Sequence, residues 1–395
     1  MKKLAVLTVL SGLMFISSIS AQPPADTVVY LLTCGPGTAT YSIYGHSALR
    51  IVVNGGESDQ VCNWGVFDFS TKHFAWKFAK GKLDYMLGIN PYNSFLEEYS
   101  SEGRWVQSQR INLSGPQKAV LIELINENLK PENRKYRYDF FYDNCATRIR
   151  DLLEKAGGEK LIYPPLLEEK KVPSFRQKIG EYQLRFPWLD FGIDLLIGTP
   201  GDKKAGFRDR MFLPIDLRSG LNELLLISGN KRIPLLSNPE TILEATVPQP
   251  DPSPLSSPLI VFSLVLIIII ILSSVIRERI PNNIMDRVIF FIYSLLAVLL
   301  IFTGFFSEHK QLHMNLNIIW LSPFVIICLL SLFREKPAVI WFRIVFSLSL
   351  VFLVISFFVP RATNNAFVPL VILLMVRSSV RAGFSWNPLS MSHLT

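Results

Sequence analysis

The sequence predicts an α+β exported domain that is followed by an α-helical membrane domain of about five spans. Three observations lead to this prediction. Residues 1–21 have the pattern of a secretory signal peptide, residues 22–247 mix strand-like and helix-like patterns, and residues 258–395 consist largely of apolar runs. Residues 248–257 are rich in proline and predict a semi-rigid linker between the two domains.

The signal segment is predicted from its charged start and its apolar stretch. Lys2 and Lys3 precede an apolar run over residues 4–16, and small residues follow as far as Ala21. This order is typical of a cleaved secretory signal, with cleavage expected near Ser20 or Ala21. Export would place the next domain outside the cytoplasm.

The exported domain begins with strand-like segments that carry a histidine. Residues 27–32 are β-branched and apolar and predict a strand, and residues 41–53 and 61–69 predict two more. Asn54-Gly55-Gly56 lies between the last two and is a strong hairpin signal. His46 therefore lies near the start of one strand of a hairpin.

The returning strand of this hairpin brings polar residues back toward His46. Asn63 and Asp68 both lie on it, and either is a candidate to contact the imidazole. His73 follows the strand and is expected at the surface.

The rest of the exported domain alternates between the two kinds of pattern. A helix is predicted over residues 116–129 from its apolar stripe, and Pro131 ends it. Weaker patterns predict an amphipathic or helical segment at 74–87, a strand within 104–113, and a helical extension near the membrane over 160–250.

The segment 140–151 carries the main candidate for chemistry. Apolar residues recur at helical spacing after Cys145, so Asp143 or Asn144 is expected at the N-cap and Cys145 in the first turn. Unpaired N–H groups and the positive end of the helix dipole favour the thiolate of a cysteine placed there. The alternative is a small buried core cysteine, the commoner fate of a single Cys.

Cys145 and His46 together outline a thiolate–imidazole pair. The imidazole takes the thiol proton and later protonates the leaving group, and a third polar group fixes its tautomer. His46 as a purely structural histidine is the alternative. No Cys or His pair has the spacing of a metal site, and no glycine-rich phosphate loop is present, so neither metal nor cofactor is expected.

Two further features of composition bear on compartment and partners. Cys34 and Cys62 could form a disulfide in an oxidising compartment. The net charge of +8 does not indicate nucleic acid, because the basic residues lie around apolar runs and in mixed-charge stretches, where they suit an anionic lipid surface.

The membrane half contains five apolar runs. The first four match the roughly 20 residues that a span requires, and the fifth is short. Basic residues are concentrated on alternate loops, which places the exported domain outside and the C-terminal tail inside. The loop with His309 and His313 then lies on the same side as the exported domain, and its polar residues serve either as interfacial anchors or as headgroup contacts. The runs cover residues 258–276, 287–306, 316–333, 338–359 and 366–376.

The order histidine, polar residue, cysteine resembles the circularly permuted NlpC-type papain-like proteins, including the lecithin:retinol acyltransferase (LRAT) type. Four longer segments are similar to the Lnb family of Bacteroidota, membrane-bound lipoprotein N-acyltransferases with an exported thiol domain. The similarity extends to His313-Met314-Asn315 before the third apolar run. The segments are 31–37 (LLTCGPG), 44–50 (YGHSALR), 63–69 (NWGVFDF) and 138–151.

The resemblance implies roles for individual residues. Cys145 is the expected nucleophile, His46 the base and Asn63 the group that orients the imidazole, where NlpC-type proteins usually have a second histidine. Asp68 is the alternative orienting group. Supporting or substrate-binding roles are expected for Tyr44, Asp143, Asn144, His313 and Asn315.

The implied reaction moves an acyl chain from a membrane phospholipid, through a thioester on Cys145, to the α-amino group of a diacylated lipoprotein N-terminal cysteine. The implied location is the bacterial inner membrane, with the catalytic domain in the periplasm. One alternative is a membrane-anchored NlpC-type cysteine peptidase acting on cell-wall peptides, although a peptidase needs at most one anchor. The other is a non-enzymatic lipid-binding membrane receptor, which would tolerate loss of Cys145.

Overall fold

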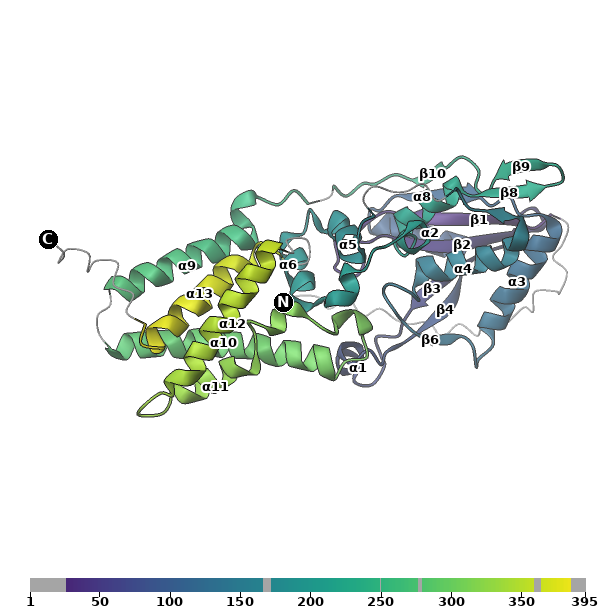
Figure 1. The fold of residues 1–395 in the computed structure, drawn as a ribbon. Helices are drawn as coiled ribbons and strands as arrows, with labels where there is room; N and C mark the ends of the chain where they lie inside the picture. The colour runs from purple at the N-terminus through teal and green to yellow at the C-terminus, as the bar shows by residue number, and fades with distance from the viewer. Residues whose placement is uncertain (1–25, 166–171, 249, 276–278, 359–363, 385–395) are drawn as a thin grey trace, which may run out of the picture.

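The computed structural model describes residues 26–165, 172–248, 250–275, 279–358 and 364–384. The predicted signal segment lies outside these residues. Figure 1 shows two parts: a sheet with its covering helices on the right, and a bundle of long helices on the left. The chain is therefore mixed α and β in its first part and helical in its last, as the sequence predicts.

A seven-stranded antiparallel sheet organises the first part. Its strands follow the order β10-β5-β1-β2-β3-β4-β6, so that the three strands from the start of the domain lie at its centre. The strands are β1 (Val28–Cys34), β2 (His46–Val53), β3 (Ser58–Val66), β4 (Asp84–Pro91), β5 (Val106–Arg110), β6 (Lys135–Arg137) and β10 (Glu240–Leu243).

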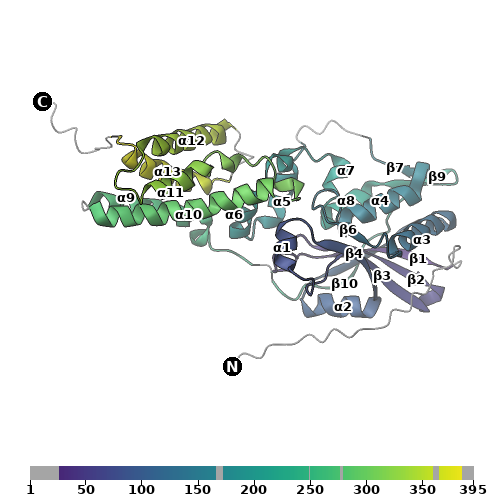
Figure 2. The same cartoon turned by 90° about the horizontal axis from the view of Figure 1, so that it is seen from below.

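Both faces of this sheet are covered by helices. In β1, Val29 and Leu31 pack into one core cluster while Leu32 and Cys34 pack into another. The alternation of side chains sends the two pairs to opposite faces, and this is why the strand has no polar face. The first face is covered by α3 (Gly115–Leu129), α4 (Cys145–Gly157) and α8 (Pro214–Glu223), the second by α2 (Tyr92–Ser101), as Figure 2 shows.

The same alternation argues against the disulfide that Cys34 and Cys62 could have formed. Cys62 packs with Leu49 on the α4 face, whereas Cys34 packs on the α2 face. Both thiols are buried and unpaired. Their side chains point away from each other across the sheet, so bridging them would require the backbone to move.

Two predicted segments differ in kind from the observed ones. Residues 74–87 form only a short helix, α1 (Phe74–Ala79), before β4 begins at Asp84. Gly81, with a φ of 69°, ends the helical part of this segment. A helix or an amphipathic segment was expected from the aromatic and basic composition, which does not show where the helix ends and the strand begins.

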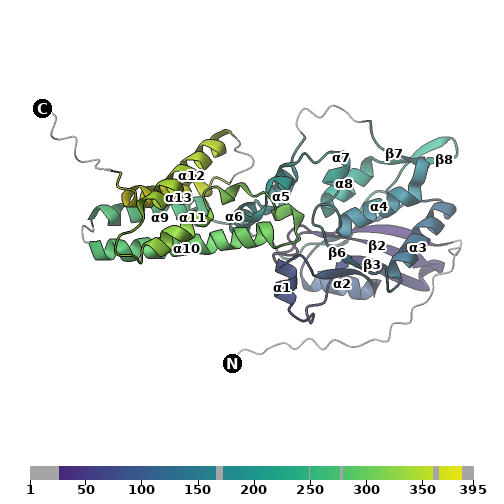
Figure 3. The ribbon, with the colours of Figure 1, turned by 60° about the horizontal axis from the view of Figure 1, so that its bottom comes forward.

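The stretch expected as a helical extension contains strands as well. Helices α5 (Phe175–Gln183) and α6 (Pro187–Leu196) do lie between the two parts of the molecule in Figure 3. Beyond them, the chain returns to the sheet domain, where α8 enters the core and β10 pairs with β5. A small sheet is formed by β7 (Leu161–Ile162), β8 (Leu225–Ser228) and β9 (Lys231–Pro234), and α7 (Phe207–Arg210) is a single turn.

The last part consists of five apolar helices. In the part of the chain that the structure describes, three are long and apolar enough to cross a membrane: Pro258–Val275, Asn283–Phe305 and Val339–Phe358. The other two are shorter. The helices are α9 (Pro258–Val275), α10 (Arg279–Phe305), α11 (Pro323–Ser331), α12 (Val339–Phe358) and α13 (Phe367–Arg381).

The third apolar run is not one continuous helix. Its first third forms a short 3₁₀ turn, Leu316–Ile318, and α11 begins only at Pro323, with Ser322 as its N-cap. Proline at the first helical position starts a helix, and the preceding residue is kept out of the helical region. A hydropathy profile of the sequence gives no sign of this break in the helix.

A buried ion pair joins the helices of the membrane part. Arg377 donates to Asp286 at 2.6 Å, both side chains are almost fully buried, and Arg381 pairs with the second oxygen of the same carboxylate. Because a buried charge is costly without a partner, the cluster fixes α13 against α10.

The two parts of the molecule are held together by hydrogen bonds to backbone carbonyls. Gly198, which follows α6, donates to the Gln311 carbonyl at 2.8 Å, and a Cβ at Gly198 would lie 1.7 Å from the His313 carbonyl oxygen. Asn315 donates to the carbonyls of Leu195 and Leu196 at 2.8 and 2.9 Å. The loop after α10 is thus fixed to α6, and the sheet domain is held at a defined position on the helical bundle.

Candidate active site

Cys145 occupies the first position of α4, and the cap before it is built by one side chain. Asn144 accepts hydrogen bonds from the backbone N–H groups of Ala146 and Thr147 at 2.8 and 2.9 Å. Its amide nitrogen donates to the carbonyls of Phe140 and Phe212 at 2.7 and 2.9 Å. The Asn144 side chain therefore fixes the start of the helix, and with it the position of the thiol.

His46 and Asn63 meet across the central strands. The pairing of β2 with β3 sets Leu49 opposite Cys62, so Ala48 falls opposite Asn63, and His46 becomes its diagonal neighbour. His46 Nε2 lies 2.5 Å from Asn63 Oδ1. An amide oxygen only accepts, so Nε2 carries the proton and donates, and Nδ1 is left for the thiol of Cys145, with which the imidazole hydrogen-bonds.

A glycine allows the histidine to approach in this way. Gly45 has a φ of 77°, and a Cβ there would lie 2.7 Å from the Cys34 carbonyl oxygen. A larger residue would be strained and would push β2 away from β1 at the point where His46 begins the strand. The position of His46 at the start of β2 therefore depends on the positive φ of Gly45.

The environment favours charge separation between the two side chains. Burial by itself would raise the pKa of the Cys145 thiol, but the neighbouring His46 and the backbone N–H groups of Ser47 and Ala146 lower the pKa below its usual value. Burial would likewise lower the pKa of His46, but Cys145 and the bond to Asn63 raise it. Both shifts act in favour of a thiolate beside an imidazolium.

The other cysteines of the sheet domain differ in this respect. Burial raises the pKa of Cys34 well above its usual value and raises the pKa of Cys62 to about 12. Both are neutral thiols inside the core. Cys145 is thus the thiol of this domain that is suited to nucleophilic attack.

A cavity of about 540 Å³ opens above Cys145 and His46. Its lining is partly apolar, with Phe67, Phe69 and Phe78, and partly polar, with Glu98, Glu102 and Arg104. Arg104 is itself buried and donates to Glu102 at 2.7 Å and to the Gly35 carbonyl at 2.8 Å. The cavity can therefore hold a ligand with an apolar part and a polar part.

Two of the predicted supporting residues take part in building this site. Tyr44 lines the cavity, and its hydroxyl accepts from Gln183 Nε2 at 2.6 Å, which links it to α5. Asp143 makes a bidentate pair with Arg148, at 2.6 and 2.9 Å, one turn into α4. Its carboxylate thus stabilises the helix start and does not line the cavity of Cys145.

Three other predicted residues lie elsewhere. Asp68 is exposed and accepts hydrogen bonds from Ser70, so Asn63 is the group that contacts the imidazole. The bulge around Gly65, with a φ of 94°, shifts the register of β3 there and ends the strand at Val66, before Asp68. His313 and Asn315 belong to the loop after α10, where Asn315 is buried and binds the carbonyls of α6.

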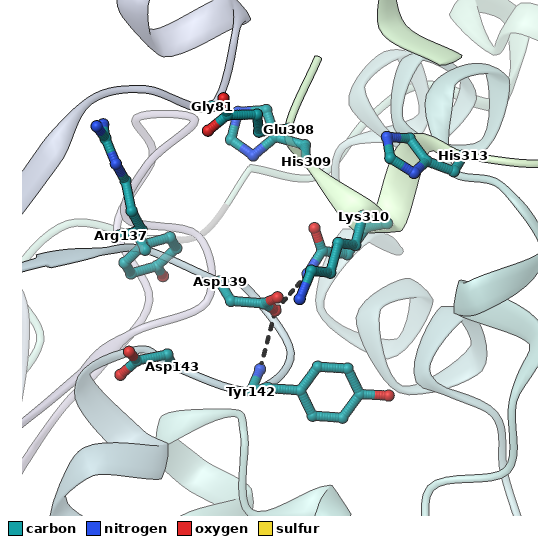
Figure 4. A pocket seen from close by; sticks show the side chains of 11 residues that line it. Gly81, Arg137, Asp139, Tyr142, Asp143, Glu308, His309, Lys310 and His313 are labelled. Carbon is teal, nitrogen blue, oxygen red and sulfur yellow. Dashed lines mark hydrogen bonds between the residues drawn. The ribbon is translucent and has the colours of Figure 1, made fainter. Parts of the chain in front are cut away.

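A second cavity, of about 590 Å³, lies between the sheet domain and the loop after α10. Figure 4 shows its polar side chains, among them Asp139, Lys310 and His313. Asp139 accepts a hydrogen bond from Gln311 and, at 3.1 Å, from the backbone N–H of Tyr142. His313 contacts this cavity and not the one above Cys145.

Several residues of the site are not evident from sequence motifs. Phe67 and Phe69 lie within the segment 63–69, whose aromatic content was a usable signal. Phe212, Leu213 and Pro214 reach the cavity from the start of α8, and nothing in their local sequence marks them. Across the described residues, no group of three or more His, Cys, Asp or Glu side chains is placed to hold a metal ion.

Comparison with known protein families gives two matches. Residues 17–167 match the model of the Lnb N-terminal periplasmic domain, and residues 250–385 match that of the Lnb transmembrane domain. The first match contains His46, Asn63 and Cys145, and the second contains the five apolar helices. No curated protein and no solved structure matches the chain.

Proposed function

The chain belongs to the Lnb family, and we propose that it is a thiol-dependent acyltransferase that transfers an acyl chain from a membrane phospholipid to the N-terminus of a diacylated lipoprotein. It is a membrane protein with a periplasmic domain, and we place it in the bacterial inner membrane. The observation that carries the proposal is the arrangement of Cys145, His46 and Asn63 in a partly apolar cavity on a domain fixed to membrane helices.

The first half-reaction uses the charge-separated pair. The Cys145 thiolate attacks the carbonyl carbon of a phospholipid ester, and the positive N-terminal end of the α4 dipole stabilises the developing negative charge. The C–O ester bond then breaks, and the His46 imidazolium gives its proton to the leaving glycerol oxygen. The products are a thioester on Cys145 and a lysophospholipid, with His46 neutral.

The second half-reaction restores the pair. The neutral α-amino group of the lipoprotein N-terminal cysteine attacks the thioester carbonyl, and Nδ1 of His46 takes the proton that the amine loses. The C–S bond breaks and leaves an amide on the lipoprotein, a thiolate on Cys145 and an imidazolium at His46. Asn63 keeps the proton on Nε2 throughout, so that Nδ1 faces the reacting atoms.

The arrangement of the three side chains resembles the permuted NlpC/LRAT type of papain-like site. We therefore assign the periplasmic domain to this type of fold. A cysteine peptidase would use the same pair. The membrane domain and the apolar part of the cavity lining favour a lipid donor over a cell-wall peptide.

The test is to trap the acyl-enzyme. The purified protein is incubated with phospholipid, and the peptide that contains Cys145 is examined by mass spectrometry. The account predicts an acyl adduct on Cys145 that hydroxylamine removes, and no adduct in Cys145→Ser. Cys62→Ser is the matched control, because that thiol is buried and outside the cavity and its loss should leave the adduct in place. Failure to acylate Cys145 in the wild type would contradict the mechanism.

A further inference from the structure

The segment from Lys72 to Lys82 exposes aromatic side chains in a way that a soluble surface rarely does. Trp76 and Phe78 on α1 are 55% and 50% exposed, and Phe69, just before the segment, is 70% exposed. These rings lie together and not singly, because Phe69 and Phe78 both contact the ring of Phe74. A cluster of this kind indicates a surface that contacts something apolar.

This segment is fixed to the outer end of a membrane helix. Ser307 and the backbone N–H of Glu308, which follow α10, donate to the carbonyls of Ala79 and Lys80 at 2.9 Å each. His309 Nε2 donates to the Phe78 carbonyl at 2.8 Å. Figures 1 and 2 show α1 beside the end of α10 that faces the sheet domain. The segment therefore lies at the level where α10 leaves the membrane.

The aromatic contacts continue onto the lipid-facing surface of α10. Trp76 packs on Phe302, with ring centroids 5.4 Å apart. The next turn of the chain exposes Phe305 and Phe306, at 77% and 63%. Aromatic residues at this depth are typical of the boundary between the hydrocarbon and the headgroups.

In the other direction, the rings lead to the candidate active site. Phe67 packs on Phe69 and on Tyr85, at 4.8 and 5.2 Å, and Tyr85 stacks on Tyr138 at 4.5 Å. Phe67, Phe69, Phe78, Tyr85 and Tyr138 all line the cavity that contains Cys145 and His46. Aromatic side chains thus extend from α1, which packs on the membrane helix, to the cavity that contains the thiol.

The charge of the segment suits the surface of an anionic bilayer. Residues 72–82 contain four lysines and no acidic residue. Lys80 lies 4.8 Å from the centre of the Trp76 ring, and Lys82 pairs with Glu308 in the loop after α10. Lysine and tryptophan together favour the headgroup region of a leaflet that contains anionic lipid.

We propose that residues 72–82 insert into the headgroup region of the periplasmic leaflet, and that the surface formed by Phe67, Phe69, Phe74 and Phe78 guides one acyl chain of a membrane phospholipid from the bilayer to Cys145. The proposal rests on the proposed function for the identity of the donor. The contact of α1 with lipid does not depend on it, because that contact follows from the position and the chemistry of the segment.

The direct test is photo-crosslinking in a bilayer. Trp76 or Phe78 is replaced by p-benzoylphenylalanine in the full chain, held in nanodiscs of phosphatidylethanolamine and phosphatidylglycerol, and irradiated. The expected result is an adduct with the mass of a phospholipid at both positions. The matched control is Val120, which is exposed on α3 at the far side of the sheet domain and should give no such adduct. Equal adduct yields at all three positions, or none at Trp76 and Phe78, would overturn the proposal.

A second measurement separates this proposal from the proposed function. Acylation of Cys145 is followed with a long-chain phospholipid and with p-nitrophenyl butyrate, which needs no path from the membrane. Trp76→Asp should slow acylation by the phospholipid by about tenfold or more relative to butyrate, since the ring that contacts the bilayer is lost. An equal effect on both donors would refute the guiding role. If neither donor acylates the wild type, the proposed mechanism fails, while the crosslinks still decide whether α1 contacts lipid.

Discussion

Replacing Asn63 by alanine removes the one hydrogen bond that sets the tautomer of His46. In the structure, His46 Nε2–H donates to Asn63 Oδ1 at 2.5 Å, and this bond together with Cys145 raises the pKa of His46 and so favours the positively charged imidazole. A hydrogen bond to a charged group contributes about 1.5–3 kcal/mol. Asn63→Ala should therefore slow acylation of Cys145 by roughly 10- to 150-fold. Loss of His46 itself should cost more, about 10²- to 10⁴-fold, because proton transfer is then lost as well.

The pH dependence gives this prediction a second readout. The lowered pKa of Cys145 and the raised pKa of His46 both increase the population of the thiolate–imidazolium pair, and the rate should fall above the pKa of His46, where the imidazolium is lost. The bond to Asn63 is one of the causes that raise the pKa of His46. Without it, the pKa of His46 falls, so the descending limb of the profile should move to lower pH in Asn63→Ala.

The assay is single-turnover acylation of Cys145 by phospholipid, measured across the pH range for each variant. Asn63→His should keep part of the activity, since an imidazole can also accept from Nε2–H. Asp68→Asn should match the wild type, because Asp68 is exposed and bonded to Ser70. Wild-type rates and an unshifted profile in Asn63→Ala would refute the orienting role, and a nearly inactive Asp68→Asn would assign that role to the carboxylate.

Three further predictions concern the scaffold around the site and the membrane topology of the chain. Asn144→Ala should lower the free energy of unfolding by about 1–3 kcal/mol in chemical denaturation, since it removes the cap of α4. Asn144→Asp should be destabilised as well, because it keeps the accepting oxygen but loses both amide donations and sets a carboxylate oxygen against the carbonyls of Phe140 and Phe212. Gly198→Ala should destabilise the chain by about 1–3 kcal/mol, because the new methyl group meets the loop after α10, whereas Gly192→Ala in α6 meets nothing within 4 Å and should not. A reporter fused after Arg381 should be cytoplasmic and one fused within residues 307–315 periplasmic, and the reversed pattern would contradict the topology.

The elements that surround Cys145 and His46 were predictable because they depend on local chemistry. Asn144 precedes a helical apolar pattern, and the Asn54-Gly55-Gly56 turn fixes a hairpin whose alternation places His46 near Asn63. The choice between Asn63 and Asp68 was not predictable in this way. It depends on the bulge at Gly65, a feature of the three-dimensional pairing of β3 with β4.

The parts that sequence reasoning missed depend on contacts between distant segments. Strand β10 joins the sheet about 130 residues after its partner β5 in the chain, as the pairing of Glu240 with Ser108 shows, and no local pattern signals such a pairing. Asn315 was expected either to contact substrate, to support the site or to anchor the loop at the interface, and the structure shows that its amide fixes the loop after α10 to α6. A polar side chain close to a membrane helix has the same sequence signature in either role.

The measurement that tests the central claim most directly is the intact mass of a lipoprotein N-terminal peptide. The peptide is purified from cells that contain the wild-type protein, from cells that lack it, and from cells that carry Cys145→Ser. The account predicts a triacylated peptide with the wild type and a diacylated peptide with a free α-amino group in the other two. A triacylated peptide in cells with Cys145→Ser as their only copy would contradict the thioester mechanism, and unchanged mass in all three strains would contradict the acyltransferase function itself.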